Sequence, residues 1–455
     1  MKKYDIILIG TGQATGTILP ELLKMKLNIG IVESDKVGGT CVNWGCTPTK
    51  TLVASARAAH MARRGSDFGV EIKDFSINFK KVMQRVNDIR VPATDGFEAW
   101  LKEVTGFYHG QASFIDDHTI KVGNETLHGG KIIIHTGTRA RKPQIAGIDT
   151  VPWLDNRGIL ALGELPEHLI VVGGSYIGLE FGQALRRLGS KVSVIGRGDR
   201  IVPREDPDIS RIAKEILIEE GVDFYLEAEL QGLEKTGQGV KTNYTRNGTP
   251  ESLTGSHVLL AVGRLPNSDT LNLAAAGVTT NERGFITVND VGQTSVPHIF
   301  ALGDVNGRGA FTHTSVHDGQ VFLAHQKGGR KKISDRIPIH SMFIDPPLAR
   351  VGMSELEARQ SGKKVLMATR EMNKINRARE KDEKSGLIKL LVEEQSNLIL
   401  GATIFGVGGD EIIGMLALAM QARLPYTKIQ DTVIPHPTVS ELIPWIFADL
   451  KPLAP

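Results

Sequence analysis

The chain has 455 residues, enough for two to four domains that each bury a core of their own. Its 54 basic and 51 acidic side chains leave a formal net charge of +3, too balanced to indicate nucleic acid or an anionic membrane as a partner. No apolar run reaches membrane-spanning length. With only two cysteines and no export signal, we expect a cytoplasmic protein without structural disulfides.

Two similar segments, one at the amino terminus and one in the middle of the chain, form an internal repeat. The first has Gly10 and Gly12 after an apolar run, and the second has Gly173 and Gly178 after another. Each predicts a buried strand, a glycine turn, a helix and a second buried strand. Neither fingerprint has all three glycines, but two in register support each other. The pattern predicts two dinucleotide-binding units, each holding a pyrophosphate at a helix N-terminus.

The second strand of each unit distinguishes the two ligands. Glu33 ends that strand in the first unit, where a carboxylate accepts hydrogen bonds from ribose hydroxyls. The equivalent residue of the second unit is Gly196, followed by Arg197 and Arg200, with Arg204 nearby. Loss of the carboxylate and gain of arginines favour a 2′-phosphate, and hence NADPH over NADH. The alternative is that these arginines belong to a solvated loop.

Both cysteines lie in residues 38–50, GGTCVNWGCTPTK. In a regular helix the Cα atoms of Cys41 and Cys46 would lie roughly 7.5 Å apart along the axis, beyond disulfide reach. A disulfide therefore requires a local distortion, which Gly45 permits. A helix beginning here, together with Lys50, favours thiolates. Between two nucleotide units the pair is a natural third station for electrons; the alternative is two reduced cysteines that never pair.

Beyond about residue 337 the pattern changes to that of an antiparallel sheet followed by an apolar helix. The predicted strands are 349–352, 386–392 and 399–404, and the predicted helix is 411–422. Near the end, His436 stands between two prolines and five residues before Glu441. A rigidly held imidazole with a carboxylate partner suits a general acid–base. The alternative is a surface turn.

Together these residues resemble the class I pyridine nucleotide-disulfide oxidoreductases, the family of dihydrolipoamide dehydrogenase, glutathione reductase and mercuric reductase. The resemblance covers essentially the whole chain. The motifs that carry it are the glycine turn at Gly10, residues 38–50, His135-Thr136-Gly137-Thr138, the second turn with Tyr176 and Glu180, Ala301-Leu302-Gly303-Asp304, and His436-Pro437-Thr438-Val439-Ser440-Glu441.

The resemblance implies an α/β fold with two Rossmann-like dinucleotide-binding domains and a carboxyl-terminal α+β dimerisation domain. The implied boundaries are 1–150 and 266–336 for the two parts of an FAD-binding domain, 151–265 for the NAD(P)-binding domain, and 337–455 for the dimerisation domain. A homodimer is implied, in which His436 acts on the disulfide of the partner subunit. No metal site is predicted.

The resemblance also assigns roles to single residues. Cys46 is expected to lie against the flavin and Cys41 to attack the substrate. Lys50, paired with Glu180, is expected near flavin N5, where positive charge stabilises the reduced ring. Tyr176 resembles the ring that covers the nicotinamide side of the flavin, although a helix-packing aromatic is the alternative. The expected cofactor contacts are Gly10, Gly12, Glu33, Gly39, Thr40, Thr136, Gly137 and Asp304 for FAD, and Gly173, Tyr176, Gly178, Arg197, Arg200 and Gly263 for NADP, with NAD possible.

The predicted reaction passes hydride from NADPH through FAD to Cys41 and Cys46, and on to a small oxidised thiol or related electrophile. Residues 345–352 and 377–380 resemble mercuric reductases, but the carboxyl-terminal cysteine pair that receives the metal is missing. One alternative is an NAD-dependent dihydrolipoamide dehydrogenase, which Gly196 disfavours. Glutathione reductase is disfavoured because residues 17–20 lack its basic residue. A slow flavin redox sensor is the remaining alternative, from another functional class.

Overall fold

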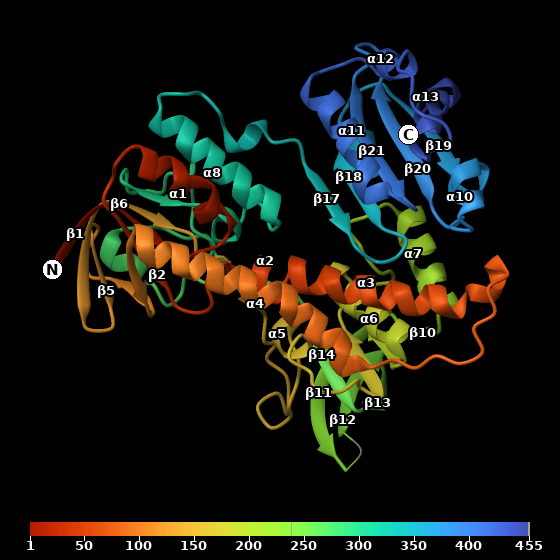
Figure 1. The fold of residues 1–455 in the computed structure, drawn as a ribbon, viewed down its shortest axis with the longest axis horizontal. Coiled ribbons are helices and arrows are strands. Elements are labelled where there is room, and N and C mark those ends of the chain that lie inside the picture. Colours follow the sequence, from red (N-terminus) through yellow and green to blue (C-terminus); the bar gives the residue numbers. More distant parts are fainter. Residues whose placement is uncertain (238, 454–455) are drawn as a thin grey trace.

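The computed structural model describes residues 1–237 and 239–453, and its first sheet lies at the amino-terminal end of the chain (Figure 1). The strand order is β3-β2-β1-β6-β5-β4, with β16 also paired to β6. The strands are β1 (Lys2–Ile9), β2 (Ile29–Glu33), β3 (Gly106–His109), β4 (Ala112–Phe114), β5 (Thr119–Val122), β6 (Glu125–Ile134) and β16 (Ile299–Ala301). Because β16 joins this sheet in parallel beside β6, a late part of the chain returns to the amino-terminal sheet.

The centre of the first sheet is buried on both faces, which explains the unbroken apolar run in β1. Ile6 and Leu8 pack with α1 (Gln13–Lys24) and α8 (Thr312–Gln326), whereas Ile7 and Ile9 pack on the opposite face. The first repeat is thus the predicted strand, turn, helix and strand.

A bundle of helices connects the first sheet to the second. It consists of α2 (Gly39–Trp44), α3 (Cys46–Arg63) and α4 (Phe79–Val104). Helices α3 and α4 run together across the middle of the molecule in Figure 1, and α3 also packs on α6 (Tyr176–Leu188). The cysteine segment therefore lies where the two nucleotide-binding units meet.

The second sheet is parallel, with the order β10-β9-β8-β14. Its strands are β8 (His168–Val172), β9 (Lys191–Ile195), β10 (Val222–Tyr225) and β14 (His257–Leu260), and its helices are α6 and α7 (Pro207–Glu219). Smaller elements surround it: β7 (Thr138–Ala140), β15 (Arg264–Pro266), α5 (Asn156–Ile159), and the sheet of β11 (Ala228–Thr236), β12 (Gly239–Arg246) and β13 (Thr249–Gly255). Together, β8, α6 and β9 form the predicted second repeat.

The carboxyl-terminal sheet is antiparallel and follows the order β17-β18-β21-β20-β19-β22. Its strands are β17 (Ile339–Met342), β18 (Leu348–Gly352), β19 (Val365–Glu371), β20 (Leu387–Glu393), β21 (Ile399–Phe405) and β22 (Lys451–Pro452). The helices are α9 (Glu355–Gln360), α10 (Asn376–Glu380), α11 (Gly409–Gln421), α12 (Tyr426–Gln430) and α13 (Ile443–Ile446). The predicted strands correspond to β18, β20 and β21, and the predicted helix to α11, each with its ends shifted by no more than two residues.

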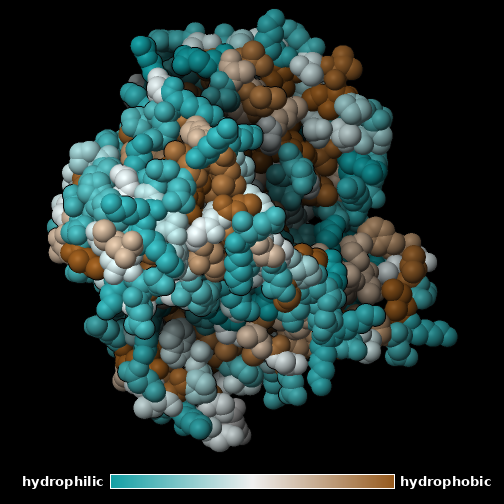
Figure 2. All heavy atoms as spheres, turned by 60° about the vertical axis from the view of Figure 1, so that its left-hand side comes forward, coloured by the Kyte–Doolittle hydropathy of each residue, from teal (hydrophilic) through white to brown (hydrophobic). Residues whose placement is uncertain are grey.

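The expected fold class is confirmed: a mixed sheet whose parallel strands carry the first glycine turn, and a parallel sheet that carries the second, are followed by an α+β unit. No helix within residues 1–237 and 239–453 combines the length and the hydropathy of a bilayer span. Figure 2 shows one face of the molecule, where hydrophobic side chains gather in patches on a largely hydrophilic surface.

Candidate active site

The two cysteines lie on either side of a helix break. Helix α2 ends at Trp44, α3 begins at Cys46, and Gly45 between them has φ −140° and ψ −116°. A side chain at Gly45 would begin 2.9 Å from the carbonyl oxygen of Thr40, so the break is closely packed. The distortion predicted from the spacing is therefore present. Both cysteines are free thiols in this structure, with Cys46 exposed and Cys41 partly buried.

The local contacts make the two sulfurs chemically different. The hydrogen bond from Cys41 lowers the pKa of Cys46 to about 6, with further stabilisation from Thr312 and the charge of Lys50. The Thr312 hydroxyl oxygen lies 3.3 Å from Cys46 Sγ. Conversely, the hydrogen bond to Cys46 and burial raise the pKa of Cys41. These contacts therefore favour the thiolate at Cys46 over Cys41.

An ion pair joins the cysteine helix to the second unit. Lys50 Nζ lies 2.8 Å from Glu180 Oε2, and the other oxygen of that carboxylate accepts the backbone N–H of Phe343 at 2.8 Å. Glu180 is buried, and the Lys50 ammonium lies 4.5 Å from the centre of the Phe343 ring. Cys46 and Lys50 are one turn apart on α3, as Tyr176 and Glu180 are on α6, so the ion pair brings both helix faces together.

The first glycine turn packs tightly against the neighbouring strand. Gly10 has φ +105°, and a Cβ there would lie 2.3 Å from the carbonyl oxygen of His135, the residue after β6. A Cβ on Gly12 would lie 2.8 Å from the His135 ring, and one on Gly39 would lie 3.1 Å from the Gly12 Cα. Gly39 and Thr40 begin α2 beside this turn. The turn therefore presents bare backbone at a helix start, as a pyrophosphate requires.

The side chains expected around the first nucleotide surround the same turn. Glu33, 8% exposed, accepts the Thr11 N–H at 3.0 Å and the Asp35 N–H at 2.9 Å. Burial raises the pKa of Asp304, which also accepts the Thr138 hydroxyl at 3.1 Å. These acceptors and the cradle fit the adenosine ribose and pyrophosphate of a dinucleotide such as FAD.

Thr136 and Gly137, two more residues of the predicted FAD site, follow the end of β6. The Thr136 hydroxyl donates to the carbonyl oxygen of Asn267 at 2.8 Å, and Gly137 has φ +65°. These contacts tie the end of β6 to the segment after β15. The hydroxyl of Thr136 is therefore already engaged with the backbone.

The second glycine turn repeats the device. Gly173 has φ +117°, and a Cβ there would lie 2.4 Å from the carbonyl oxygen of Ala261, the residue after β14. A Cβ on Gly178 would lie 2.2 Å from the Gly173 oxygen. Gly263 has φ +114° and faces open space. This turn also fits a dinucleotide pyrophosphate.

The arginines after β9 are open to solvent. Arg197 and Arg204 are exposed, and Arg200 is half-buried and donates to the carbonyl oxygen of Pro203 at 3.3 Å. Gly196 is buried at the end of β9. Within the described ranges, neither Arg197 nor Arg204 is paired with a carboxylate. Two cationic side chains are thus available to an incoming anion.

His436 and Glu441 form the predicted pair at the carboxyl-terminal end. His436 Nδ1 lies 2.9 Å from one Glu441 carboxylate oxygen and 3.1 Å from the other. The His436 side chain is 74% exposed, and apolar Val433 and Trp445 nearby in sequence are 95% and 67% exposed. The carboxylate fixes the imidazole tautomer so that Nε2 faces outward as a base. An exposed imidazole–carboxylate pair beside apolar surface suits a site completed by a second subunit.

Some residues around the site were not found from the sequence. Thr312 touches Cys46, Phe343 contacts the ion pair, and Glu205 receives the Tyr176 hydroxyl. The fourth is His135: burial lowers its pKa to about 4, so its ring is neutral beneath the first glycine turn. None of the four belongs to a motif with a fixed spacing. Only His135 could have been found from the sequence, because it begins the segment His135-Thr136-Gly137-Thr138.

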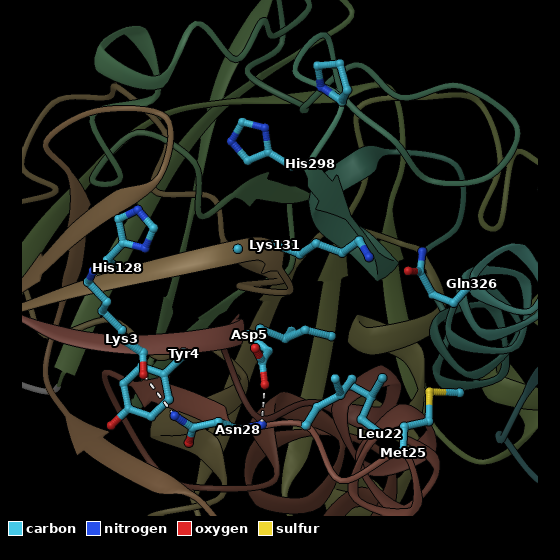
Figure 3. Close-up of a pocket in the computed structure, with 14 residues that line it drawn as sticks. Lys3, Tyr4, Asp5, Leu22, Met25, Asn28, His128, Lys131, His298 and Gln326 are labelled. Carbon is cyan, nitrogen blue, oxygen red and sulfur yellow. Dashed lines mark hydrogen bonds between the residues drawn. The ribbon is translucent and has the colours of Figure 1, made fainter.

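An open pocket of about 940 Å³, shown in Figure 3, is lined by none of these residues. Lys3, His128, Lys131 and His298 are among its lining residues, at the amino-terminal end of β1. In open parallel sheets, ligands bind beyond the carboxyl ends of the strands, where Gly10 lies. The cysteine region is therefore the better candidate despite the size of this pocket.

Comparison with protein families gives two matches that together span most of the chain. Residues 4–319 match the pyridine nucleotide-disulphide oxidoreductase family, and residues 339–447 match the dimerisation domain of the same family.

Individual relatives agree. A probable pyridine nucleotide-disulfide oxidoreductase, RclA of Escherichia coli, is 35% identical, over 99% of this chain and 100% of its own. Mercuric reductase of Lysinibacillus sphaericus is 30% identical, over 96% and 81%. Dihydrolipoyl dehydrogenase of Geobacillus stearothermophilus is 31% identical, over 96% and 94%. The solved Cu(II) complex of the HOCl-induced flavoprotein disulfide reductase RclA from Escherichia coli is 33% identical, with a TM-score of 0.90 over 98% of this chain and 99% of that one.

Proposed function

The chain belongs to the pyridine nucleotide-disulfide oxidoreductase family, and from that premise we propose that it uses NADPH to reduce a small oxidised thiol or a related electrophile. It is a flavoprotein enzyme of a family that uses FAD and a pyridine nucleotide and carries that family's dimerisation domain. For a disulfide substrate, NADPH, one proton and RSSR give NADP⁺ and two RSH. The observation that carries the proposal is the polarised pair of Cys41 and Cys46 beside the Lys50–Glu180 ion pair.

The domains and the cofactor follow the same plan. Residues 1–150 and 266–336 are proposed to hold FAD, residues 151–265 NADPH, and residues 337–455 a second copy of the chain in a cytoplasmic homodimer. Bound FAD supplies the relay that accepts hydride from the nicotinamide and passes two electrons to the disulfide. The residues proposed to hold it are Gly10, Gly12, Glu33, Gly39, Thr40, Thr136, Gly137 and Asp304.

The two sulfurs divide the work. Cys46, with its pKa lowered to about 6, is the thiolate that stays by the cofactor. Cys41, whose pKa is raised, needs a base before it attacks the substrate sulfur. His436 of the partner subunit, oriented by Glu441, takes that proton and returns it to the leaving thiolate. Lys50 contributes positive charge beside Cys46.

The coenzyme is proposed to be NADPH because of what surrounds Gly196. No carboxylate at that position repels a 2′-phosphate, and Arg197 and Arg204 are exposed and unpaired within the described residues. Dihydrolipoyl dehydrogenase remains the alternative, since such an enzyme is 31% identical to the chain. NADH preference together with lipoamide turnover would establish it.

The oxidised substrate is to be identified by testing a defined panel of compounds. Mercuric reductases are about 30% identical, but this chain has no third cysteine for metal delivery. RclA has been solved as a Cu(II) complex. The panel is therefore glutathione disulfide, lipoamide, Hg(II) and Cu(II).

The test uses two matched variants, Cys46→Ser and Cys41→Ser, in the purified flavoprotein. Both are expected to be reduced by NADPH and to lose disulfide turnover, because the dithiol needs both sulfurs. Only Cys41→Ser should show the long-wavelength absorbance of a thiolate beside oxidised flavin. Wild-type turnover in either variant would refute the proposal, and that absorbance in Cys46→Ser would reverse the sulfur assignment.

A further inference from the structure

Tyr176 is tied to a neighbouring loop through its hydroxyl. It is the first residue of α6, directly after the second glycine turn, and its hydroxyl donates to Glu205 Oε1. The ring lies against His340, with centroids 5.7 Å apart and planes tilted by 34°. The side chain is therefore held at its polar end as well as along its ring.

Glu205 is a buried carboxylate with several cationic or donor partners. Its side chain is 1% exposed, and Oε1 also lies 3.1 Å from His340 Nε2. Burial alone would raise the pKa of Glu205, but the His340 hydrogen bond and the charge of Arg350 keep it below its usual value. The carboxylate is therefore ionised at neutral pH, which makes the bond from Tyr176 charge-assisted.

The partners of Glu205 come from the carboxyl-terminal sheet. His340 on β17 and Arg350 on β18 are directly opposite each other across the strand pair. Arg350 Nε lies 3.6 Å from Glu205 Oε2, and within the described residues neither atom has a hydrogen-bond partner. Arg350 therefore acts on Glu205 as an ion-pair partner through Oε2 and does not compete with Tyr176 for Oε1.

The same group of side chains reaches the cysteine side of the site. Phe311 stacks on His340, with centroids 5.7 Å apart and planes 9° from parallel. The next residue is Thr312, whose hydroxyl lies 3.3 Å from Cys46 Sγ. Tyr176 and Cys46 are thus linked through Glu205, His340 and residues 311–312.

We propose that Glu205 is a positioning residue that latches Tyr176 in its resting place, so that entry of the nicotinamide must break the Tyr176–Glu205 hydrogen bond. The inference rests on the proposed function and on the role that the family resemblance gives Tyr176, whose ring is expected to cover the nicotinamide side of the flavin. It concerns the loop carboxylate that holds the ring, not the ring alone.

The latch has a measurable consequence for coenzyme binding. When only a fraction of molecules is open, the apparent dissociation constant is the intrinsic one divided by that fraction. A hydrogen bond to a charged group that is lost on opening reduces the open fraction by about tenfold or more. Removing the bond should therefore tighten dinucleotide binding.

The experiment is calorimetric titration of NADP⁺ into the oxidised holoenzyme, with the flavin difference spectrum as a second readout. The variants are Tyr176→Phe, Glu205→Gln and their combination. Tyr176→Phe should lower the Kd by about tenfold, because it removes the charge-assisted bond. Glu205→Gln should lower it less, because the amide oxygen can still accept the Tyr176 hydroxyl without the charge. The double variant should match Tyr176→Phe, since both changes act on one interaction.

The matched control is Tyr244→Phe. Tyr244, on β12 beside the second sheet, also donates its hydroxyl to a glutamate, Glu251, at 3.0 Å. Loss of this bond should leave the Kd unchanged. Single variants that behave like this control, or effects that add in the double variant, would overturn the latch.

Three further outcomes are distinguishable. If Glu205→Gln does not fold, Tyr176→Phe, which removes only a hydroxyl, decides by its Kd alone. If NADPH and NADH both fail to reduce the wild-type flavin, the proposed function falls, and the latch with it. If the wild-type flavin is reduced but the Kd of Tyr176→Phe is unchanged, only the latch falls.

Discussion

The glycine turn after β1 and the glycine turn after β8 use the same backbone device. Gly10 and Gly173 both have φ above +100°. At each, a Cβ would collide with the carbonyl oxygen of the residue after the neighbouring strand, His135 for Gly10 and Ala261 for Gly173. The units differ where their second strands end. Glu33 is buried and bonded to the turn, whereas Gly196 is followed by arginines that reach into solvent.

This difference separates a resident cofactor from an exchanging one. An enclosed carboxylate tied to its own turn is ready to receive a ribose in a fixed place, which suits FAD. Exposed arginines can attract a phosphate and release it, which suits a coenzyme that must leave after each turnover. On the proposed function, the same βαβ unit would thus hold one dinucleotide permanently and exchange the other, through the residues at one strand end.

The second unit is fixed to the carboxyl-terminal sheet by a buried ammonium. Lys389 on β20, 2% exposed, lies 3.0 Å from Asp206, 3.0 Å from Asp208 and 2.7 Å from Glu355. We expect Lys389→Ala to lower the free energy of unfolding by about 3–5 kcal/mol, because the buried Asp206 and the two carboxylates beside it would lose their cation. Denaturant titration measures this. Lys384→Ala, which removes an exposed pair with Asp382, is the control and should cost under about 1 kcal/mol; equal losses would contradict the account.

Glu33→Ala should weaken FAD binding to the first unit and leave coenzyme binding to the second unit unchanged. The substitution removes the carboxylate proposed to accept the ribose hydroxyls; two hydrogen bonds to a charged group are worth about 3 kcal/mol, so FAD affinity should fall roughly 100-fold. Flavin content after purification and equilibrium dialysis measure the loss. Glu21→Ala, a change of a partly exposed glutamate on α1, is the control. Full flavin retention in Glu33→Ala would mean that this carboxylate does not hold the ribose.

Arg197→Glu should change the second unit alone. A carboxylate beside the 2′-phosphate repels it, so the preference for NADPH over NADH should fall about tenfold while flavin content stays normal. Steady-state kinetics with both coenzymes measure the ratio of kcat/KM values. Arg211→Glu changes an exposed arginine paired with Glu215 on α7 and should leave the ratio unchanged. If Arg197→Glu also leaves it unchanged, the phosphate is recognised elsewhere.

The smallest expected effect concerns the pH dependence of the Cys46 thiolate, which lies where the two nucleotide-binding units meet. Because the pKa of Cys46 is lowered to about 6, its thiolate should be present at pH 8 and protonated at pH 4. The long-wavelength absorbance of the two-electron-reduced enzyme should therefore rise with pH through about 6. Lys50→Ala should move this midpoint upward, since it removes a positive charge that stabilises the thiolate. A midpoint near 9 in the wild type would contradict the pKa ordering of the two cysteines.

Much of this architecture could be predicted because it depends on local patterns. The βαβ units follow from apolar runs and glycines, and the break at Gly45 follows from the geometry of a helix. The helix dipole favoured thiolates at both sulfurs, however, and only the three-dimensional contacts, the hydrogen bond between the sulfurs and the charge of Lys50, favour Cys46 over Cys41.

The Lys50–Glu180 ion pair was implied by the family resemblance, but other contacts between distant segments at the site were not predicted. Thr312 reaches Cys46 across 266 residues of sequence, and His340 reaches Glu205 across 135. These contacts depend on how the helices and the carboxyl-terminal sheet pack, which no spacing motif encodes. The roles assigned to His436 and Arg197 remain predictions, because each depends on a second molecule: the partner subunit for His436 and NADPH for Arg197.

The most direct test of the central claim is an anaerobic titration of the purified flavoprotein with NADPH, counting reactive thiols at each step. The account predicts that the first equivalent yields two thiols, with the flavin still oxidised and long-wavelength absorbance present. If the first equivalent instead bleaches the flavin and yields no thiols, Cys41 and Cys46 do not carry the electrons, and the proposed reductase mechanism is wrong.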